Sequence, residues 1–134
     1  MTNLLEIEGI GPANAARLEK IGVTSIEQLL RDGATPAGRR KIATDSGIDD
    51  GKVLEWVNHA DLMRINGVGS EYSDLLEAAG VDSVPELATR NPENLHAKMI
   101  EVNAARKLVR REPSLSETQR WVAEAKTLDR IVTH

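Results

Sequence analysis

A short glycine-rich stretch occurs twice in this chain of 134 residues, first as Ile7-Glu8-Gly9-Ile10-Gly11 and again, fifty-eight residues later, as Ile65-Asn66-Gly67-Val68-Gly69. Segments 4–30 and 62–88, aligned at that offset, share ten identical residues in twenty-seven positions. Self-similarity at one fixed spacing indicates a duplicated structural unit. We therefore divide the chain into two pseudo-repeats, residues 1–61 and 62–134. One such unit cannot bury its apolar face alone, so we expect both to pack as a single domain spanning residues 1–134.

The sequence on either side of both stretches has a helical pattern. No run of four to eight residues alternates apolar and polar side chains with β-branched enrichment, so strands are not supported. Capping residues followed by Gln, Glu or Pro mark helix starts, and they are Ser25, Thr35, Ser83, Asn91 and Ser114. We expect an all-α fold with a short helix ending near Glu8 and further helices over about 12–21, 25–32, 36–46, 49–64, 70–79, 83–90, 92–110 and 115–130. Trp56 and Trp121 are expected in its core because their neighbours are apolar at helical spacing.

Both glycines of each stretch are expected in backbone conformations that a Cβ atom would penalise, because the chain reverses within about three residues. The following helix begins at Pro12 or Ser70. Its first N–H groups lack partners within the helix and lie at the positive end of the helix dipole. Each turn is therefore a possible site for a phosphate group.

An apolar-x-Gly-apolar-Gly turn between two helices resembles the helix-hairpin-helix motif. Nearly the whole chain resembles the small bacterial tandem helix-hairpin-helix proteins grouped as a domain of unknown function, which implies a SAM-like helical bundle. The segments that carry this likeness are Gly67-Val68-Gly69-Ser70-Glu71-Tyr72, Leu75-Leu76-Glu77-Ala78-Ala79-Gly80-Val81 and Arg90-Asn91-Pro92-Glu93-Asn94-Leu95. A more distant likeness extends to helical DNA-binding modules of recombinases and of the RNA polymerase alpha subunit. The resemblance implies contact with the nucleic-acid backbone, without base reading, through Gly9, Ile10, Gly11, Ala13, Gly67, Val68 and Gly69.

The chain departs from the family pattern just after the second glycine, where nucleic-acid-binding members often carry Lys or Arg. The first copy continues as Pro12-Ala13-Asn14 and the second as Ser70-Glu71-Tyr72, followed shortly by Asp74. The first turn thus keeps its backbone donors without a cation, whereas the second places two carboxylates where a phosphate would lie. We expect the first turn to be the better phosphate site. The alternative is that both turns are structural joints only.

Cations gather in two places. A small group, Arg39-Arg40-Lys41, lies near an expected helix start, where the helix dipole does not favour positive charge, and Arg39 and Arg40 are its candidate binding residues. The denser group comprises Arg106, Lys107, Arg110 and Arg111, and an extended helix would distribute these four over about half of its surface. The alternative for the denser group is that it complements the dipole of a helix that Pro113 ends.

The bulk composition disfavours several classes of protein. The net charge is −4 and the aromatic residues are Trp56, Tyr72 and Trp121, so neither a strongly basic DNA-binding protein nor a single-strand binder built on stacking is expected.

There is no cysteine, and Glu55 with His59 is a pair of metal ligands without a third. No phosphate loop or activated nucleophile is recognisable, so we expect no metal, no cofactor and no enzymatic activity. No secretory signal and no apolar run of ~20 residues is present, so we expect a cytoplasmic protein without a membrane partner.

Two functions remain open. The first is weak, sequence-independent binding to double-stranded DNA through the first turn, Arg39, Arg40 and the 106–111 cluster. The second is a protein-interaction or scaffold module that kept the fold and lost its cations. We expect the first, by analogy with the usual partner of the fold.

Overall fold

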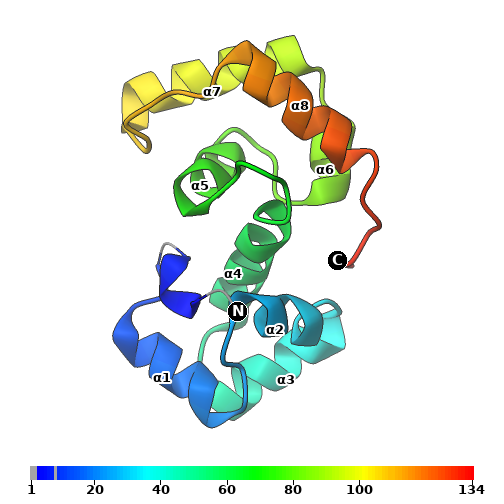
Figure 1. Ribbon diagram of the computed structural model, residues 1–134. Coiled ribbons are helices and arrows are strands. Elements are labelled where there is room, and N and C mark those ends of the chain that lie inside the picture. Colours follow the sequence, from blue (N-terminus) through cyan, green and yellow to red (C-terminus); the bar gives the residue numbers. More distant parts are fainter. Residues whose placement is uncertain (1–2, 8) are drawn as a thin grey trace. The chain divides into compact units, whose positions relative to one another are not determined.

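Helices form all the regular secondary structure in the part of the chain that the computed structural model describes, residues 3–7 and 9–134 (Figure 1). They are a short 3-10 helix, η1 (Leu4–Glu6), and the α-helices α1 (Pro12–Lys20), α2 (Ile26–Asp32), α3 (Pro36–Ser46), α4 (Asp50–Leu62), α5 (Ser70–Ala78), α6 (Val84–Ala88), α7 (Pro92–Arg106) and α8 (Leu115–Ala125). The prediction of an all-α fold is confirmed. The helix expected to end near Glu8 is η1 at residues 4–6, and Glu8 itself lies outside the described residues.

Five of these helices begin where the capping residues predicted a start. The side chains that accept the N–H group three residues later, at 3.0–3.3 Å, are Ser25, Thr35, Ser83, Asn91 and Ser114. Only at α8 is the reciprocal bond of a capping box present, with Ser114 N donating to Glu117 Oε1 at 3.0 Å. Each such cap stabilises its helix by about 1 kcal/mol because it satisfies a donor that the helix leaves without a partner.

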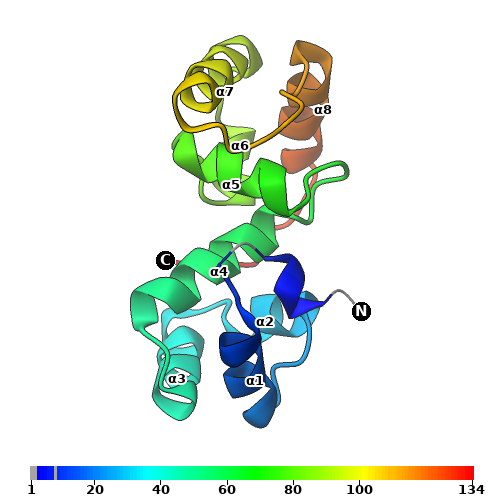
Figure 2. The same ribbon diagram turned by 90° about the vertical axis from the view of Figure 1, so that its left-hand side faces the viewer.

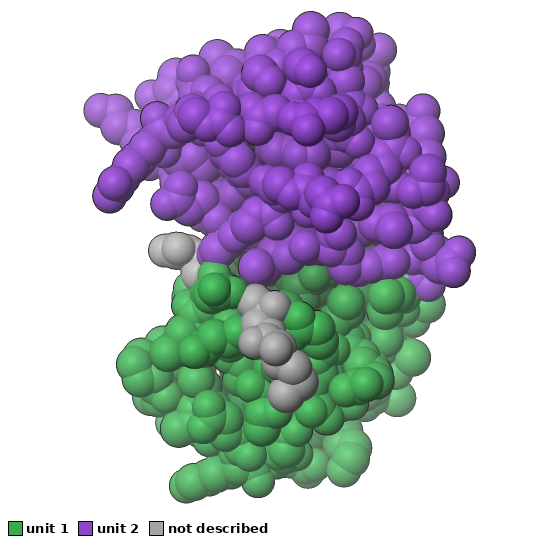
Figure 3. Space-filling view, viewed as in Figure 1, with its two compact units in different colours: residues 1–61, 131–134 green, residues 62–130 purple. Residues whose placement is uncertain are grey.

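The chain divides into two compact units, which Figure 3 colours separately. Unit 1 comprises residues 1–61 and 131–134, and unit 2 comprises residues 62–130. The division after residue 61 falls at the predicted limit between the pseudo-repeats, but the four final residues belong to unit 1. A single domain over residues 1–134 stays a prediction.

Each unit buries its own apolar side chains. In unit 1, α1 contacts η1 and α3, and α2 contacts α3; in unit 2, α8 contacts α6 and α7, and α7 also contacts α5 (Figure 2). Trp56 and Trp121 are both 2% exposed, which confirms their expected place in the core. In unit 2, Trp121 is part of a cluster with residues such as Leu75, Leu76 and Met99.

The first glycine of each turn takes a conformation that requires glycine. Gly9 has a φ of +92° and Gly67 has a φ of +89°. A Cβ atom on Gly9 would lie 3.5 Å from Trp56 Nε1, and one on Gly67 would lie 3.3 Å from Trp121 Nε1. Both turns therefore pack against the indole of a buried tryptophan in their own unit.

The second glycine of each turn does not need this freedom, so the expectation of strained dihedrals at Gly11 and Gly69 is wrong. Their φ angles are −81° and −98°, in ordinary extended backbone. A Cβ atom at either position would meet nothing within 4 Å. Both are the N-cap residues of the helices that follow, α1 and α5.

Two helices end earlier than the sequence pattern predicts. The helix expected over residues 92–110 ends at Arg106, because Lys107 adopts a left-handed conformation with a φ of +51°. Segment 106–111 is therefore not a helical face, and the expected pairing of its cations along a helix is wrong. The final helix, expected to reach residue 130, ends at Ala125.

Candidate nucleic-acid interface

The N-terminus of α5 has no side-chain cap. Its N-cap is Gly69, which has no side chain to accept a hydrogen bond. Within the described residues, the N–H groups of Glu71 and Tyr72 in the first helical turn have no hydrogen-bond partner. The first turn of α1, after Gly11, likewise has no side-chain cap. Such ends attract anions because the N–H groups and the positive end of the helix dipole point the same way.

We call segment 106–111 the basic loop; Arg106 is the last residue of α7, and residues 107–111 lie between α7 and α8 in unit 2. The buried side chain of Asn103 anchors this loop through two hydrogen bonds. Its Oδ1 accepts a hydrogen bond from Val109 N at 2.9 Å, and its Nδ2 donates to Val109 O at 3.2 Å. The Tyr72 hydroxyl donates to Arg111 O at 2.8 Å, so the loop is also tied to α5. These bonds fix the loop backbone while Arg106, Lys107 and Arg110 remain exposed.

Arg111 is held in a fixed orientation by Glu117. Its Nη1 and Nη2 donate to the two carboxylate oxygens of Glu117 at 2.9 and 2.8 Å. The guanidinium carbon also lies 5.9 Å from the centroid of the Tyr72 ring. The hydrogen bonds from Arg111, with one from the Ser114 backbone, lower the pKa of Glu117 to about 2. Burial of the Tyr72 ring raises its pKa, and the Arg111 charge partly offsets this rise.

The second turn, the start of α5 and the basic loop border one cavity of about 410 Å³. Its lining residues are Gly67, Gly69, Ser70, Glu71, Tyr72, Arg110 and Arg111. Two guanidinium groups and a helix N-terminus around one cavity form an environment suited to a phosphate. Glu71 is the one carboxylate in this lining, whereas Asp74 does not take part. The cations thus lie beside the second turn, which the sequence predicts to be the poorer phosphate site.

In both turns the apolar residue between the two glycines is buried. Gly9 and Ala13 are exposed, but Ile10 is buried, as is its counterpart Val68. The Ile10 N–H donates to Ile7 O at 3.1 Å, and the Val68 N–H donates to Ile65 O at 3.0 Å. These two N–H groups close the turns, so they are not available to a ligand.

Of the three cations of α3, which are Arg39, Arg40 and Lys41, one is buried inside unit 1. Arg39 is only 7% exposed, and its Nη1 and Nη2 donate to Gly33 O and Thr133 O, each at 2.8 Å. Burial lowers the pKa of this guanidinium. We therefore leave Arg39 out of the candidate interface. Arg40 is exposed and belongs to unit 1, whereas the basic loop and the 410 Å³ cavity belong to unit 2.

Tyr72 and Glu117 were not identified as site residues by sequence reasoning. Tyr72 acts through its hydroxyl on the backbone of Arg111, a contact across thirty-nine residues that no local pattern reveals. Glu117 was recognisable as the fourth residue of a capping box, and that role is present. Its second role, pairing with Arg111, depends on the loop geometry.

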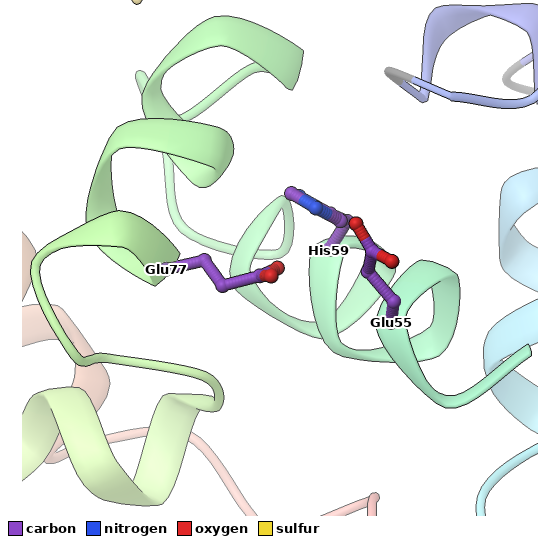
Figure 4. Close-up of side chains that lie close together, drawn as sticks. All are labelled: Glu55, His59 and Glu77. Atoms are coloured by element: carbon purple, nitrogen blue, oxygen red, sulfur yellow. The ribbon is translucent and has the colours of Figure 1, made fainter. Parts of the chain in front are cut away.

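The predicted pair Glu55 and His59 lies on α4 in unit 1 (Figure 4). Glu55 is exposed and His59 is buried. Figure 4 also labels Glu77, which belongs to unit 2.

None of the described helices is long and apolar enough to cross a membrane.

Because Glu117 pairs with Arg111, we expect the stability of the folded protein to fall at acid pH. The folded pKa of Glu117 is about 2 against an ordinary value of 4.5, so its contribution is fully present above pH ~4.5 and is lost as the pH falls toward 2. We expect wild type to have a higher melting temperature than Glu117→Gln at pH 7, and the difference to shrink progressively below pH ~4.5. Thermal melts of both proteins from pH 7 to 2 measure this. A difference that stays constant across that range would contradict the pairing.

Comparison with known proteins places this helical chain in a family. No curated protein and no solved structure matches it. Residues 8–128 match a family described as a domain of unknown function (DUF4332), and this match includes most of each unit. The chain is therefore a member of the DUF4332 family.

Proposed function

We propose that the two glycine turns are helix-hairpin-helix turns, and that the second one binds the phosphate backbone of double-stranded DNA, weakly and without reading base sequence. The observation that carries this proposal is the cavity shared by the N-terminus of α5, Arg110 and Arg111. The module catalyses no reaction in this account. Its cytoplasmic location is part of the proposal.

The backbone of the basic loop is held by neighbouring side chains, which supports a binding role for its cations. A non-glycine residue in the left-handed region, here Lys107, costs on the order of 1 kcal/mol and persists only where the surroundings impose it. The Asn103 side chain and the Tyr72 hydroxyl impose the loop conformation through three hydrogen bonds. A prearranged cationic loop loses little conformational entropy on binding, and this favours association. Lys107 is at the same time the C-cap residue of α7, and its N–H donates to Asn103 O at 2.8 Å.

The same residues explain why binding should be weak and independent of sequence. The net charge of −4 opposes approach to a polyanion, and Glu71 lines the cavity beside the two arginines. A helix N-terminus and guanidinium groups contact phosphates, which carry no sequence information directly. Arg111 also shares its donors with Glu117.

A protein-interaction or scaffold role is the second candidate, and Glu71 is the observation that favours it. A carboxylate in the cavity lining suits a partner that offers a cation as well as an anion. The test of the DNA proposal therefore centres on this residue.

Replacing Glu71 with Lys is expected to strengthen DNA binding several-fold. The change removes a repulsion and adds one phosphate contact, so the slope of log affinity against log salt becomes steeper by about 0.9. Fluorescence polarisation with two duplexes of unrelated sequence measures both quantities. Glu19→Lys, an exposed position on α1 in unit 1, makes the same change in net charge and is the matched control. Equal gains in both variants would show that net charge alone, and not the cavity, determines binding.

A further inference from the structure

A cavity of about 270 Å³ lies in unit 1, where α1 and α2 end beside α3. Its apolar wall consists of Ile21, Val23 and Ile42, and the last two are 2% and 4% exposed. Gly38 contributes backbone only, and a Cβ atom there would collide with the carbonyl oxygen of Asp32, so α3 packs directly against the end of α2. The volume equals that of about nine water molecules, which is room for a small organic molecule.

Three charged side chains complete the lining, and two of them are negative. They are Asp32, Lys41 and Asp45. The Lys41 Nζ lies 3.1 Å from Asp45 Oδ2. The Asp32 carboxylate accepts a hydrogen bond from the neutral Gln28 amide at 3.4 Å, and within the described residues it forms no ion pair. The cavity therefore holds one negative charge in excess.

The donor groups that could bind an anion here are already engaged. The Gly38 N–H, in the first turn of α3, donates to Thr35 Oγ1 at 3.0 Å. The ammonium group of Lys41 is paired with Asp45. A cation, in contrast, would meet Asp32 and the C-terminal ends of α1 and α2, and such helix ends favour positive charge. The charge and the apolar wall together therefore favour a ligand that has a cationic group and a hydrocarbon part.

We propose that this cavity binds a small aliphatic amine. The ammonium group of the ligand lies at Asp32, which gains an ionic partner, and its alkyl chain lies against Val23 and Ile42. The Lys41–Asp45 pair does not hold this space firmly, because its side chains are 79% and 44% exposed and exposed ion pairs contribute little to stability. This binding is separate from the DNA proposal, which concerns unit 2.

A series of linear amines tests the proposal on the unmodified chain. Ethylammonium, n-butylammonium and n-hexylammonium are titrated and followed by two-dimensional NMR of the backbone amides. We expect saturable shifts centred on Gly38 and Ile42, and an affinity that rises up to about fourfold with each added methylene, the gain from burying one such group. n-Hexanol should bind roughly fivefold more weakly than n-hexylammonium, because its hydrogen bond to Asp32 lacks the ligand charge. Equal affinities for the amine and the alcohol, or shifts that do not saturate, would overturn the proposal.

Two variants with opposite expected effects identify the carboxylate. Asp32→Asn should weaken n-hexylammonium binding roughly fivefold, whereas Lys41→Gln, which removes the competing cation, should strengthen it. Asp50→Asn, at an exposed position on α4 outside the cavity, makes the same change in net charge as Asp32→Asn and is the matched control. All three side chains are exposed, so we expect the variants to fold. Equal weakening by the two Asp→Asn changes would mean attraction by net charge alone, against the proposal.

A lysine side chain of a partner protein offers the same chemistry, and a peptide distinguishes the two sources. The tripeptide Gly-Lys-Gly carries its ammonium group on a four-carbon stem, the same length as that of n-butylammonium. We expect the tripeptide to bind more weakly than n-butylammonium, because the longer molecule loses more conformational freedom on binding. Binding of the tripeptide that is as tight or tighter would overturn the proposal in favour of a protein partner.

Discussion

Replacing Gly67 with Val is expected to lower the free energy of unfolding by about 1–3 kcal/mol, because a β-branched residue is forced to a φ of +89°. The added Cβ would also lie 3.3 Å from Trp121 Nε1, inside the usual contact distance. Chemical denaturation followed by helical circular dichroism measures the change.

Gly69→Val is the matched control for this prediction. Gly69 lies two residues away in the same turn, but its φ is −98° and a Cβ there meets nothing within 4 Å. We expect this variant to lose much less stability than Gly67→Val. Equal losses in the two variants would mean that the turn geometry described for the first glycine is incorrect.

Neutralising the exposed cations of the basic loop is expected to lower DNA affinity more than tenfold at ~50 mM salt. The variant Arg106→Gln/Lys107→Asn/Arg110→Gln keeps side chains of similar polarity and places Asn, which tolerates left-handed backbone, at position 107. It also leaves Arg111 and its pair with Glu117 unchanged. The salt slope should become shallower by about 0.9 for each phosphate that the variant no longer neutralises.

Arg40→Gln in unit 1 provides the control for a single exposed charge. We expect it to change affinity much less than Arg110→Gln, because the 410 Å³ cavity lies in unit 2. Equal reductions in affinity from these two single changes would indicate binding through net charge rather than through the cavity.

Local chemistry explains why much of the fold was predictable from the sequence. Capping residues such as Ser25 and Asn91 act on an N–H group only three residues away, so their positions mark helix starts directly. Trp56 and Trp121 are recognisable as core residues from their apolar neighbours. The repeated glycine stretch located both turns, although it did not show which glycine of each pair needs a positive φ.

The candidate site was less predictable because it depends on contacts between distant residues. The pattern continues helically past Arg106, yet the Asn103 side chain bonds the Val109 backbone instead and the helix ends. Because α7 ends early, Arg110 and Arg111 lie in a loop, and they border the same cavity as the second turn. Arg39 has the sequence context of a surface cation, yet it is buried and one of its bonds is to the Thr133 backbone, ninety-four residues away along the chain.

Titration of the unmodified chain with a fluorescent DNA duplex at ~50 and ~200 mM salt tests the proposed function most directly. We expect weak binding at the lower salt, equal for unrelated sequences, with a slope of log affinity against log salt of about −0.9 for each phosphate contacted. We also expect a steeper slope for Glu71→Lys. Absence of binding at ~50 mM salt, even for Glu71→Lys, would contradict the DNA proposal and favour the protein-interaction role.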